Sequence, residues 1–415
     1  MAQQITANIL KPELVSPAGD RESLITAVKN GADAVYFGVK GLSMRNMAKN
    51  FHINEMKKNM DFLKKHNKKG YLALNVLIYD SEIKKIEKIV KKAKEAGVDA
   101  VICWDMAVAG FLKENGMKMH LSTQASVSNF AAVKYYYQQG ARRIVLAREC
   151  SLADIIRIKQ RIKKEGLNCQ LEAFVHGAMC VSVSGRCLLS EHAFSKSANR
   201  GECYQPCRRE FMIKDVQDKN EYVLGEHYIL SSKDLCTIDF IDRLLSSGID
   251  ALKIEGRMRS PEYVGAVTKA YRTAINAFFS KTFDDKLKTK LKKRLKTFYN
   301  RGFTSGFYFK KQNATGGIAK TGFKKEFLGE VTKFYKKLQV AEIKIKNAGV
   351  ALQNTLLISG KNTPADFFEV KEMQVNKKFI KTAVKGQSIG IKTHFKVRRN
   401  DKVFLITPKQ KNNFQ

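Results

Sequence analysis

Hydrophobic residues in the first 257 positions recur as short continuous runs that alternate with amphipathic stretches. Four of these runs open with a glycine-containing turn: NGADAVYFG (30–38), AGVDAVICW (96–104), QGARRIVLA (139–147) and SGIDALKIE (247–255). Glycine at the end of an amphipathic helix supplies a left-handed cap, and the apolar run that follows has the length of a strand. The pattern therefore predicts the helix-to-strand turn of a repeating β/α unit.

Four further apolar runs, near 13–19, 70–78, 117–125 and 169–177, bring the predicted strands to eight. Continuously apolar strands are typical of a parallel sheet whose outer face is covered by helices. The first strand ends in SPAGD rather than in a glycine-rich phosphate loop, which favours a TIM-like (β/α) barrel over an open doubly wound sheet. Polar residues at the carboxyl ends of the strands should then meet at one mouth. They are Asn75, Asp105, His120, Gln124, Arg148, Glu149, His176, Glu255 and Arg257.

The pattern changes after the predicted barrel. From Lys286 the chain reads KLKTKLKKRLK, with leucines at helical spacing, which predicts a basic helix with a narrow apolar stripe. From about residue 325, short alternating strands predict a small all-β barrel. We therefore expect a barrel over 1–282, a basic helix and linker over 283–320, and a β-barrel over 321–415. The phrases GVALQNTLLISG and KGQSIGIK resemble the second domain of translation elongation factors, which implies a module that lies against structured RNA.

The net charge of +36 favours a nucleic acid as partner, although a merely solvated, lysine-rich surface is the alternative interpretation. The basic helix suits phosphate contacts better than a membrane surface, because its apolar face is thin and lacks Trp. No apolar run reaches the roughly 18 residues of a spanning helix, and the first residues show no signal-peptide pattern. We expect a cytoplasmic protein without a membrane partner.

Eight cysteines in a cytoplasmic chain argue against disulfides, and five of them fall between positions 180 and 236. These five are Cys180, Cys187, Cys203, Cys207 and Cys236. Their broad, irregular spacing differs from paired zinc knuckles, except at Cys203 and Cys207, and favours an iron–sulfur cluster wrapped by glycine-containing loops. Zinc and unligated cysteines remain alternatives. Because five thiols compete for four positions, Cys207 and Cys236 are rival fourth ligands; Cys236 is expected on the helical approach to the eighth strand.

The string EAFVHGAMC (172–180), followed by GRCLLS (185–190), resembles the signature of peptidase family U32, the collagenase-like proteases. Similar phrases extend the resemblance from about residue 13 to 310: ELVSPAGD, GADAVYFG, HLSTQASVSN, SSKDLC, GIDALKIEGRMRSPEYV and NRGFTSGFY. The resemblance implies proteolysis, hydroxylation of tRNA wobble uridine or ribosomal RNA, or oxygen-independent ubiquinone hydroxylation. It also implies a 4Fe–4S cluster in the hydroxylating members, with ligands that align with Cys180, Cys187, Cys203 and Cys236, and prephenate as the oxygen source in the tRNA branch.

Chemistry favours hydroxylation over proteolysis, because the sequence contains neither G-x-S-x-G nor H-E-x-x-H. The basic helix and the β domain favour the RNA branch over the quinone branch. A dianionic donor needs guanidinium clamps, for which the candidates are Arg148, Arg186 and Arg257. Candidate general acids or bases are Glu172, His176 and Glu255; Tyr204 and Phe211 are candidates for stacking a base.

The sequence thus predicts an iron–sulfur-dependent RNA hydroxylation enzyme acting on tRNA wobble uridine. The alternatives are a collagenase-like peptidase, ribosomal RNA hydroxylation, and a non-catalytic RNA-binding partner.

Overall fold

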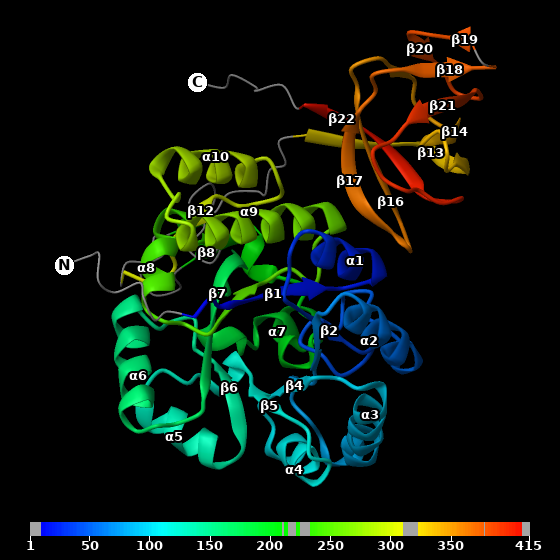
Figure 1. Cartoon of the computed structure of the whole chain (residues 1–415). Helices are drawn as coiled ribbons and strands as arrows, with labels where there is room; N and C mark the ends of the chain where they lie inside the picture. The colour runs from blue at the N-terminus through cyan, green and yellow to red at the C-terminus, as the bar shows by residue number, and fades with distance from the viewer. Residues whose placement is uncertain are drawn as a thin grey trace.

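The computed structural model describes residues 10–209, 233–309, 323–376 and 378–408, together with the backbone of two short strands at 211–214 and 221–224. Figure 1 shows a barrel surrounded by helices, with a separate β domain beside it. Phe211, a predicted base-stacking residue, has a side chain outside the described set.

Eight parallel strands form the barrel, as the sequence predicts. They are β1 (Glu13–Ala18), β2 (Ala34–Gly38), β3 (Lys69–Ala73), β4 (Ala100–Cys103), β5 (Met119–Leu121), β6 (Ala141–Val145), β7 (Gln170–Ala178) and β11 (Ala251–Ile254). Each strand pairs with the next, and β11 pairs with both β7 and β1, which closes the ring. The predicted TIM-like barrel is therefore confirmed.

An outer ring of helices covers the strands (Figure 1). It contains α1 (Arg21–Lys29), α2 (Met56–Lys65), α3 (Ile83–Ala96), α4 (Met106–Glu114), α5 (Phe130–Gln138), α6 (Leu152–Lys164), α8 (Ile241–Ser246) and α9 (Pro261–Phe279). In α3, Ile86, Ile89, Val90 and Ala93 are buried at helical spacing, and Gly97 ends the helix at φ 73°. A positive φ costs glycine little, so the amphipathic stripe and the glycine together define this helix.

The connection from β7 to β11 departs from a simple β/α repeat. It contains α7 (Leu189–Phe194), β8 (Phe211–Lys214), β9 (Glu221–Leu224) and β10 (Asp234–Cys236). β10 lies antiparallel to β7, and β12 (Phe303–Thr304) pairs with β10. The sequence placed Cys236 on the helical approach to the last barrel strand, and that placement is wrong. Cys236 is the last residue of a strand and pairs with His176.

The basic segment forms α10 (Asp285–Lys296), with Leu291 and Leu295 buried as predicted. The strands of the β domain are β13 (Phe323–Tyr335), β14 (Val340–Ile345), β15 (Val350–Ala351), β16 (Thr355–Gly360), β17 (Thr363–Glu369), β18 (Met373–Val375), β19 (Lys378–Phe379), β20 (Thr382–Ala383), β21 (Ser388–Lys392) and β22 (Lys402–Pro408). All their pairings are antiparallel. The apolar run FFEVKEMQV is divided between β17 and β18.

The β domain packs against the barrel helices through β17. The backbone N–H of Ala365 donates to Thr26 Oγ1 on α1 over 3.0 Å in a buried contact. Lys325 forms an ion pair of 3.1 Å with Glu262 on α9. These contacts join the domain to helices that surround the barrel. Among the described helices, none has the length and apolar character required to cross a membrane.

Candidate functional site

A cavity of about 490 Å³ opens where the carboxyl ends of the barrel strands meet. Its wall includes residues at or just beyond strand ends, among them Asn75, Gln124, Arg148, Glu255 and Arg257. The barrel rule predicted these five at the mouth, and the structure brings them together there. Asp105 instead caps α4, His120 is buried beside Tyr71, and Glu149 contacts the loop that follows β7.

Residues 179–209, which we call the thiol loop, cover one side of the cavity. Four thiols of this loop line the same cavity: Cys180, Cys187, Cys203 and Cys207. Gly201 has φ 83°, and a Cβ on it would lie 2.0 Å from the carbonyl oxygen of Ser43. Only glycine permits this approach to the loop after β2. Arg200 also forms an ion pair of 2.5 Å with Glu82, which directly precedes α3. This ion pair attaches the thiol loop to the barrel.

The thiols make few contacts of their own. Cys180 Sγ lies 3.1 Å from Ser182 Oγ, and Cys187 Sγ accepts the N–H of Leu189 at 3.4 Å. Burial raises the pKa of the Cys207 thiol to about 11, and the nearby Cys180 and Cys203 add to this rise. Across residues 10–209 and the other described segments, no three His, Cys, Asp or Glu side chains gather around one point. The four thiols therefore line one cavity without converging on a single point.

Cys236, in contrast, does not line the cavity. Its side chain is buried, and the hydroxyl of Tyr271 on α9 lies 3.9 Å from its sulfur. Burial raises the pKa of this thiol to about 11. The structure therefore brings Cys207 to the cavity with the other three thiols, whereas Cys236 lies on β10 beside β7 and outside the cavity lining.

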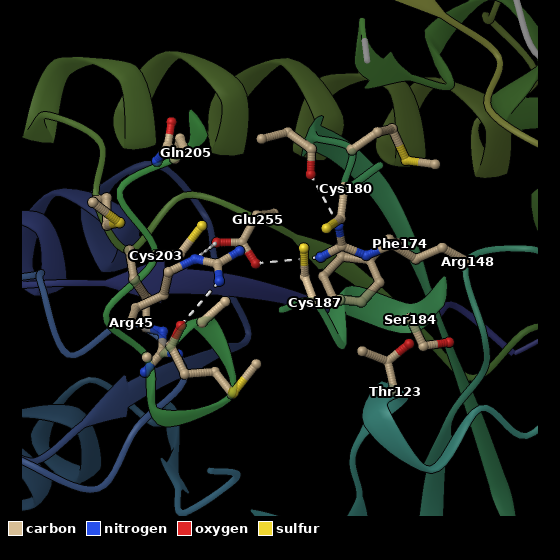
Figure 2. Close-up of a pocket in the computed structure, with 18 of the residues that line it drawn as sticks. Arg45, Thr123, Arg148, Phe174, Cys180, Ser184, Cys187, Cys203, Gln205 and Glu255 are labelled. Carbon is tan, nitrogen blue, oxygen red and sulfur yellow. Dashed lines mark hydrogen bonds and ion pairs between the residues drawn. The ribbon is translucent and has the colours of Figure 1, made fainter. Parts of the chain in front are cut away.

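The centre of the site is an ion-pair group in which arginines outnumber carboxylates. Glu255 Oε1 lies 3.3 Å from Arg45 Nε, and Glu255 Oε2 lies 3.5 Å from Arg148 Nη2. Figure 2 shows Glu255 between these two arginines, with Cys180, Cys187 and Cys203 around them. Arg257, also a lining residue, is buried against Ser43. We call Arg45, Arg148, Arg257 and Glu255 the mouth cluster.

Each arginine of the mouth cluster is held by one hydrogen bond from an Nη atom. Arg45 Nη1 donates to the carbonyl oxygen of the preceding residue at 3.0 Å, and Arg148 Nη1 donates to that of Ala178 at 2.9 Å. Arg257 Nη1 donates to the Ser43 hydroxyl. The Nε atoms of Arg148 and Arg257 are buried and have no hydrogen-bond partner among the described residues. The guanidinium groups are thus fixed in place while part of their donor capacity is unused.

Glu255 is ionised at neutral pH. Burial alone would raise the pKa of this carboxyl, but the charges of Arg45, Arg148 and Arg257 outweigh burial and lower it to about 2. The same ion pairing raises the pKa of Arg45, because its cationic form is stabilised by the carboxylate. A neutral general acid at Glu255 would need a pKa near the working pH. A carboxyl whose pKa is lowered in this way is better suited to charge balance and positioning than to proton transfer.

Besides Cys236, three other residues predicted for the site lie outside the cavity lining. Glu172 is buried within the barrel, where it accepts from Lys253 Nζ at 2.6 Å and Arg143 Nη1 at 3.1 Å. His176 packs against α9, and Arg186 is exposed, with its Nη2 donating to Ser126 Oγ at 3.0 Å. Burial lowers the pKa of His176 to about 4, so this imidazole is neutral at pH 7.

A local irregularity explains the position of His176. Along β7, Phe174 pairs with Lys253 and His176 pairs with the next residue, Ile254, so β7 carries one additional residue at this point. Such a bulge breaks the alternation of side chains between the two faces of a strand. Phe174 consequently lines the cavity while the ring of His176 meets Tyr271 with centroids 5.6 Å apart.

Sequence reasoning missed Arg45, Arg208 and Lys253, all of which line the cavity. Arg45 lies in the long irregular segment between β2 and α2, where no periodicity marks a residue as inward-facing. Lys253 lies on β11, two residues before Glu255. Because side chains two residues apart on a strand point to the same face, this spacing was the available signal. Arg208 follows Cys207 directly and shares its place in the thiol loop.

The fold and the site together define a (β/α)-barrel protein with a mouth lined by thiols and arginines. Residues 19–317 match the family model described as peptidase family U32, and the chain belongs to this family. It is 41% identical to an uncharacterized protease of Methanocaldococcus jannaschii over 95% of this chain and 98% of that protein. It is 35% identical to a collagenase of Porphyromonas gingivalis (97% and 100%) and 32% identical to a tRNA hydroxylation protein of Escherichia coli (82% and 84%).

Proposed function

We propose that this protein hydroxylates RNA, with the wobble uridine of tRNA as its target, a 4Fe–4S cluster as its cofactor and prephenate as its oxygen donor. The observation that carries the proposal is the meeting of thiols and arginines in one cavity at the carboxyl ends of the barrel strands. The similarity to tRNA hydroxylation proteins supports the choice of RNA as substrate.

The donor set supports a cluster. Four thiols line the cavity without converging on one point, whereas a zinc ion holds its ligands around itself at about 2.3 Å. In an all-thiolate cluster each iron takes its own cysteine, so the sulfurs can stand further apart. Cys180, Cys187, Cys203 and Cys207 are the residues we assign to it. When bound, such a cluster supplies one-electron transfer or Lewis-acid activation of an oxygen-bearing donor, which side chains do not offer.

The mouth cluster supports an anionic donor. Three guanidinium groups face the single carboxylate of Glu255, so positive charge is in excess there. Arginine presents paired N–H donors that match a carboxylate, and the anchored guanidiniums would hold such a ligand at low entropic cost. Arg45 replaces Arg186 in this role, because Arg45 lines the cavity and Arg186 lies outside it.

Charge on the outside of the barrel supports RNA as the macromolecular substrate. On α10, Lys290, Lys293 and Lys296 are exposed, and among the described residues they form no ion pair, unlike Lys292, which pairs with Asp239. Tyr299, three residues after the end of α10, lines the cavity and stacks with Arg259, whose guanidinium carbon lies 3.9 Å from the ring centroid. The basic helix therefore ends near the mouth, where phosphate contacts would guide an RNA loop to the cavity.

A collagenase-like peptidase is the second candidate, because the collagenase relative is similar over its whole length. Thiol or hydroxyl nucleophiles require a base within hydrogen-bond reach. In the described parts of the chain, no Ser or Cys side chain is hydrogen-bonded to a histidine, and His176 faces α9 instead of Cys180. The site geometry consequently favours hydroxylation.

The test is mass spectrometry of nucleosides from tRNA of cells that carry or lack the gene. We expect 5-hydroxyuridine to disappear on deletion and to return with the wild-type gene but not with Cys203→Ser. Unchanged tRNA with altered ribosomal RNA would move the protein to the ribosomal branch. Full restoration by Cys203→Ser would indicate a non-catalytic partner. Unchanged RNA together with collagen cleavage by the purified protein would establish the peptidase.

A further inference from the structure

The outer side of the thiol loop carries an exposed aromatic group that the proposed chemistry does not use. Cys203 and Gln205 line the cavity, but Tyr204 between them does not, and 44% of its surface is exposed. Gln205 has φ 57°, a left-handed conformation that a non-glycine residue rarely adopts. This turn separates the residues that face the cavity from the ring that faces outward.

Tyr204 belongs to a stack of planar groups. Its ring centroid lies 5.6 Å from that of Phe194 on α7, and the guanidinium carbon of Arg209 lies 4.5 Å from the Phe194 centroid. Leu188, just before α7, is 69% exposed. We call Leu188, Phe194, Tyr204 and Arg209 the aromatic wall. Its members stand on the outer side of the chain that bears Cys187, Cys203 and Cys207.

The backbone that carries Tyr204 is fixed. The side chain of Ser190 is buried, and its hydroxyl accepts the N–H of Tyr204 at 3.0 Å and donates to the carbonyl oxygen of Glu202 at 3.3 Å. A tyrosine held in this way presents a large flat surface with little conformational entropy to lose on binding. The exposed ring is therefore organised before any ligand arrives.

We propose that the aromatic wall binds an unpaired base of the substrate RNA, next to the base that enters the cavity. Every nucleobase offers a flat π-face, and proteins bind single-stranded nucleic acid by combining such aromatic surfaces with cationic side chains. Arg209, whose guanidinium lies over Phe194, and exposed Lys196, two residues after Phe194, supply positive charge at the wall, which favours RNA over an apolar protein surface. This inference rests on the proposed function, and it adds the place where a neighbouring base is held.

The experiment measures binding of a fluorescent RNA hairpin by the cluster-containing protein, using anisotropy at several salt concentrations. The hairpin is an anticodon stem-loop transcript with an unpaired loop, and a blunt RNA duplex of equal length is the second probe. For Tyr204→Ala we expect roughly fivefold or greater weakening for the hairpin and no change for the duplex. The dependence of affinity on salt should stay the same, because no phosphate contact is removed.

Two further variants separate stacking from loss of structure. Tyr204→Phe keeps the ring and should bind the hairpin as the wild type does. Tyr135→Ala removes a tyrosine that is 56% exposed on α5, away from the cavity, and should have no effect. Wild-type hairpin affinity in Tyr204→Ala overturns the proposal, as does equal weakening of hairpin and duplex binding. Unaltered RNA binding with loss of self-association or of a protein partner would assign the wall to protein contacts instead.

The outcome is independent of the proposed reaction. If tRNA in deletion cells keeps its hydroxylated uridine while Tyr204→Ala still weakens hairpin binding, the reaction fails and the aromatic wall remains. If hydroxylation depends on the gene but Tyr204→Ala has full affinity for the hairpin, the wall fails and the reaction remains.

Discussion

Two groups of charges in the same barrel differ in how completely they are paired. Inside the barrel, Glu172 contacts Lys253 at 2.6 Å and Arg143 at 3.1 Å, and Arg143 also contacts Glu13 at 2.7 Å. We call these four residues the interior cluster, of which Lys253 also lines the cavity. In the mouth cluster, the two ion pairs of Glu255 are longer, at 3.3 and 3.5 Å, and a third arginine has no carboxylate partner among the described residues.

This difference separates a structural role from a binding role. Buried charges are tolerated when each finds a hydrogen-bonded partner, as in the interior cluster. A buried surplus of one sign costs stability unless a ligand of the opposite sign completes it. The mouth cluster has this surplus, and it adjoins the thiols. Glu172, although it resembles a catalytic acid in the sequence, belongs to the interior cluster.

The largest expected effect concerns the thiols beside the mouth cluster. Because Cys207 lines the cavity and Cys236 lies outside its lining, we expect Cys207→Ser to abolish the cluster and Cys236→Ser to retain it. Iron and sulfide assays with visible spectra of anaerobically purified protein would measure this. Cys169→Ser, at a buried cysteine away from the cavity, is the control. Loss of the cluster in Cys236→Ser alone would restore the alignment-based assignment. A colourless protein with stoichiometric zinc would end the cluster hypothesis.

The second prediction compares one carboxylate from each cluster. Glu172→Ala leaves the buried Lys253 without its carboxylate and Arg143 with Glu13 alone, and we expect the free energy of unfolding to fall by about 3–5 kcal/mol. Glu255→Gln removes longer ion pairs at a site that ligands can reach, so the loss should stay below about 2 kcal/mol. Urea denaturation of both variants gives the two values. Equal losses would contradict the distinction between the clusters.

The third prediction concerns the ligand of the mouth cluster. Arg45→Ala removes a guanidinium from the cavity wall, and we expect prephenate affinity to fall by about tenfold, the order of one charged hydrogen bond. Arg186→Ala provides the matched control, since Arg186 is exposed and outside the cavity. Isothermal titration calorimetry of both proteins would measure the change. If the two substitutions weaken binding equally, the loss reflects general charge rather than a defined clamp.

The barrel was predictable because its signal is repeated. The strands pair in the expected order, and residues at strand ends such as Arg148, Glu255 and Arg257 reach the mouth. The failures have local causes. The bulge in β7 turns His176 towards α9, and Arg45 reaches the cavity from an irregular loop that Gly201 approaches closely. Neither a bulge nor a loop-to-loop contact leaves a periodic pattern, so the sequence alone did not place these side chains.

The smallest expected effect is a flat pH response of the mouth cluster. The pKa of Glu255 is lowered to about 2, so its ion pairs are fully formed above the ordinary carboxyl range and are lost only as the pH falls through about 2. Among the described residues, no histidine lines the cavity. Prephenate affinity should therefore change by less than about twofold between roughly pH 6 and pH 7.5, a window in which histidine titrates. Calorimetry in buffers of matched ionic strength tests this. A tenfold change in prephenate affinity over this window would identify another titrating group in the site. If Glu255→Gln shows the same tenfold change, that group titrates independently of the ion pairs of Glu255.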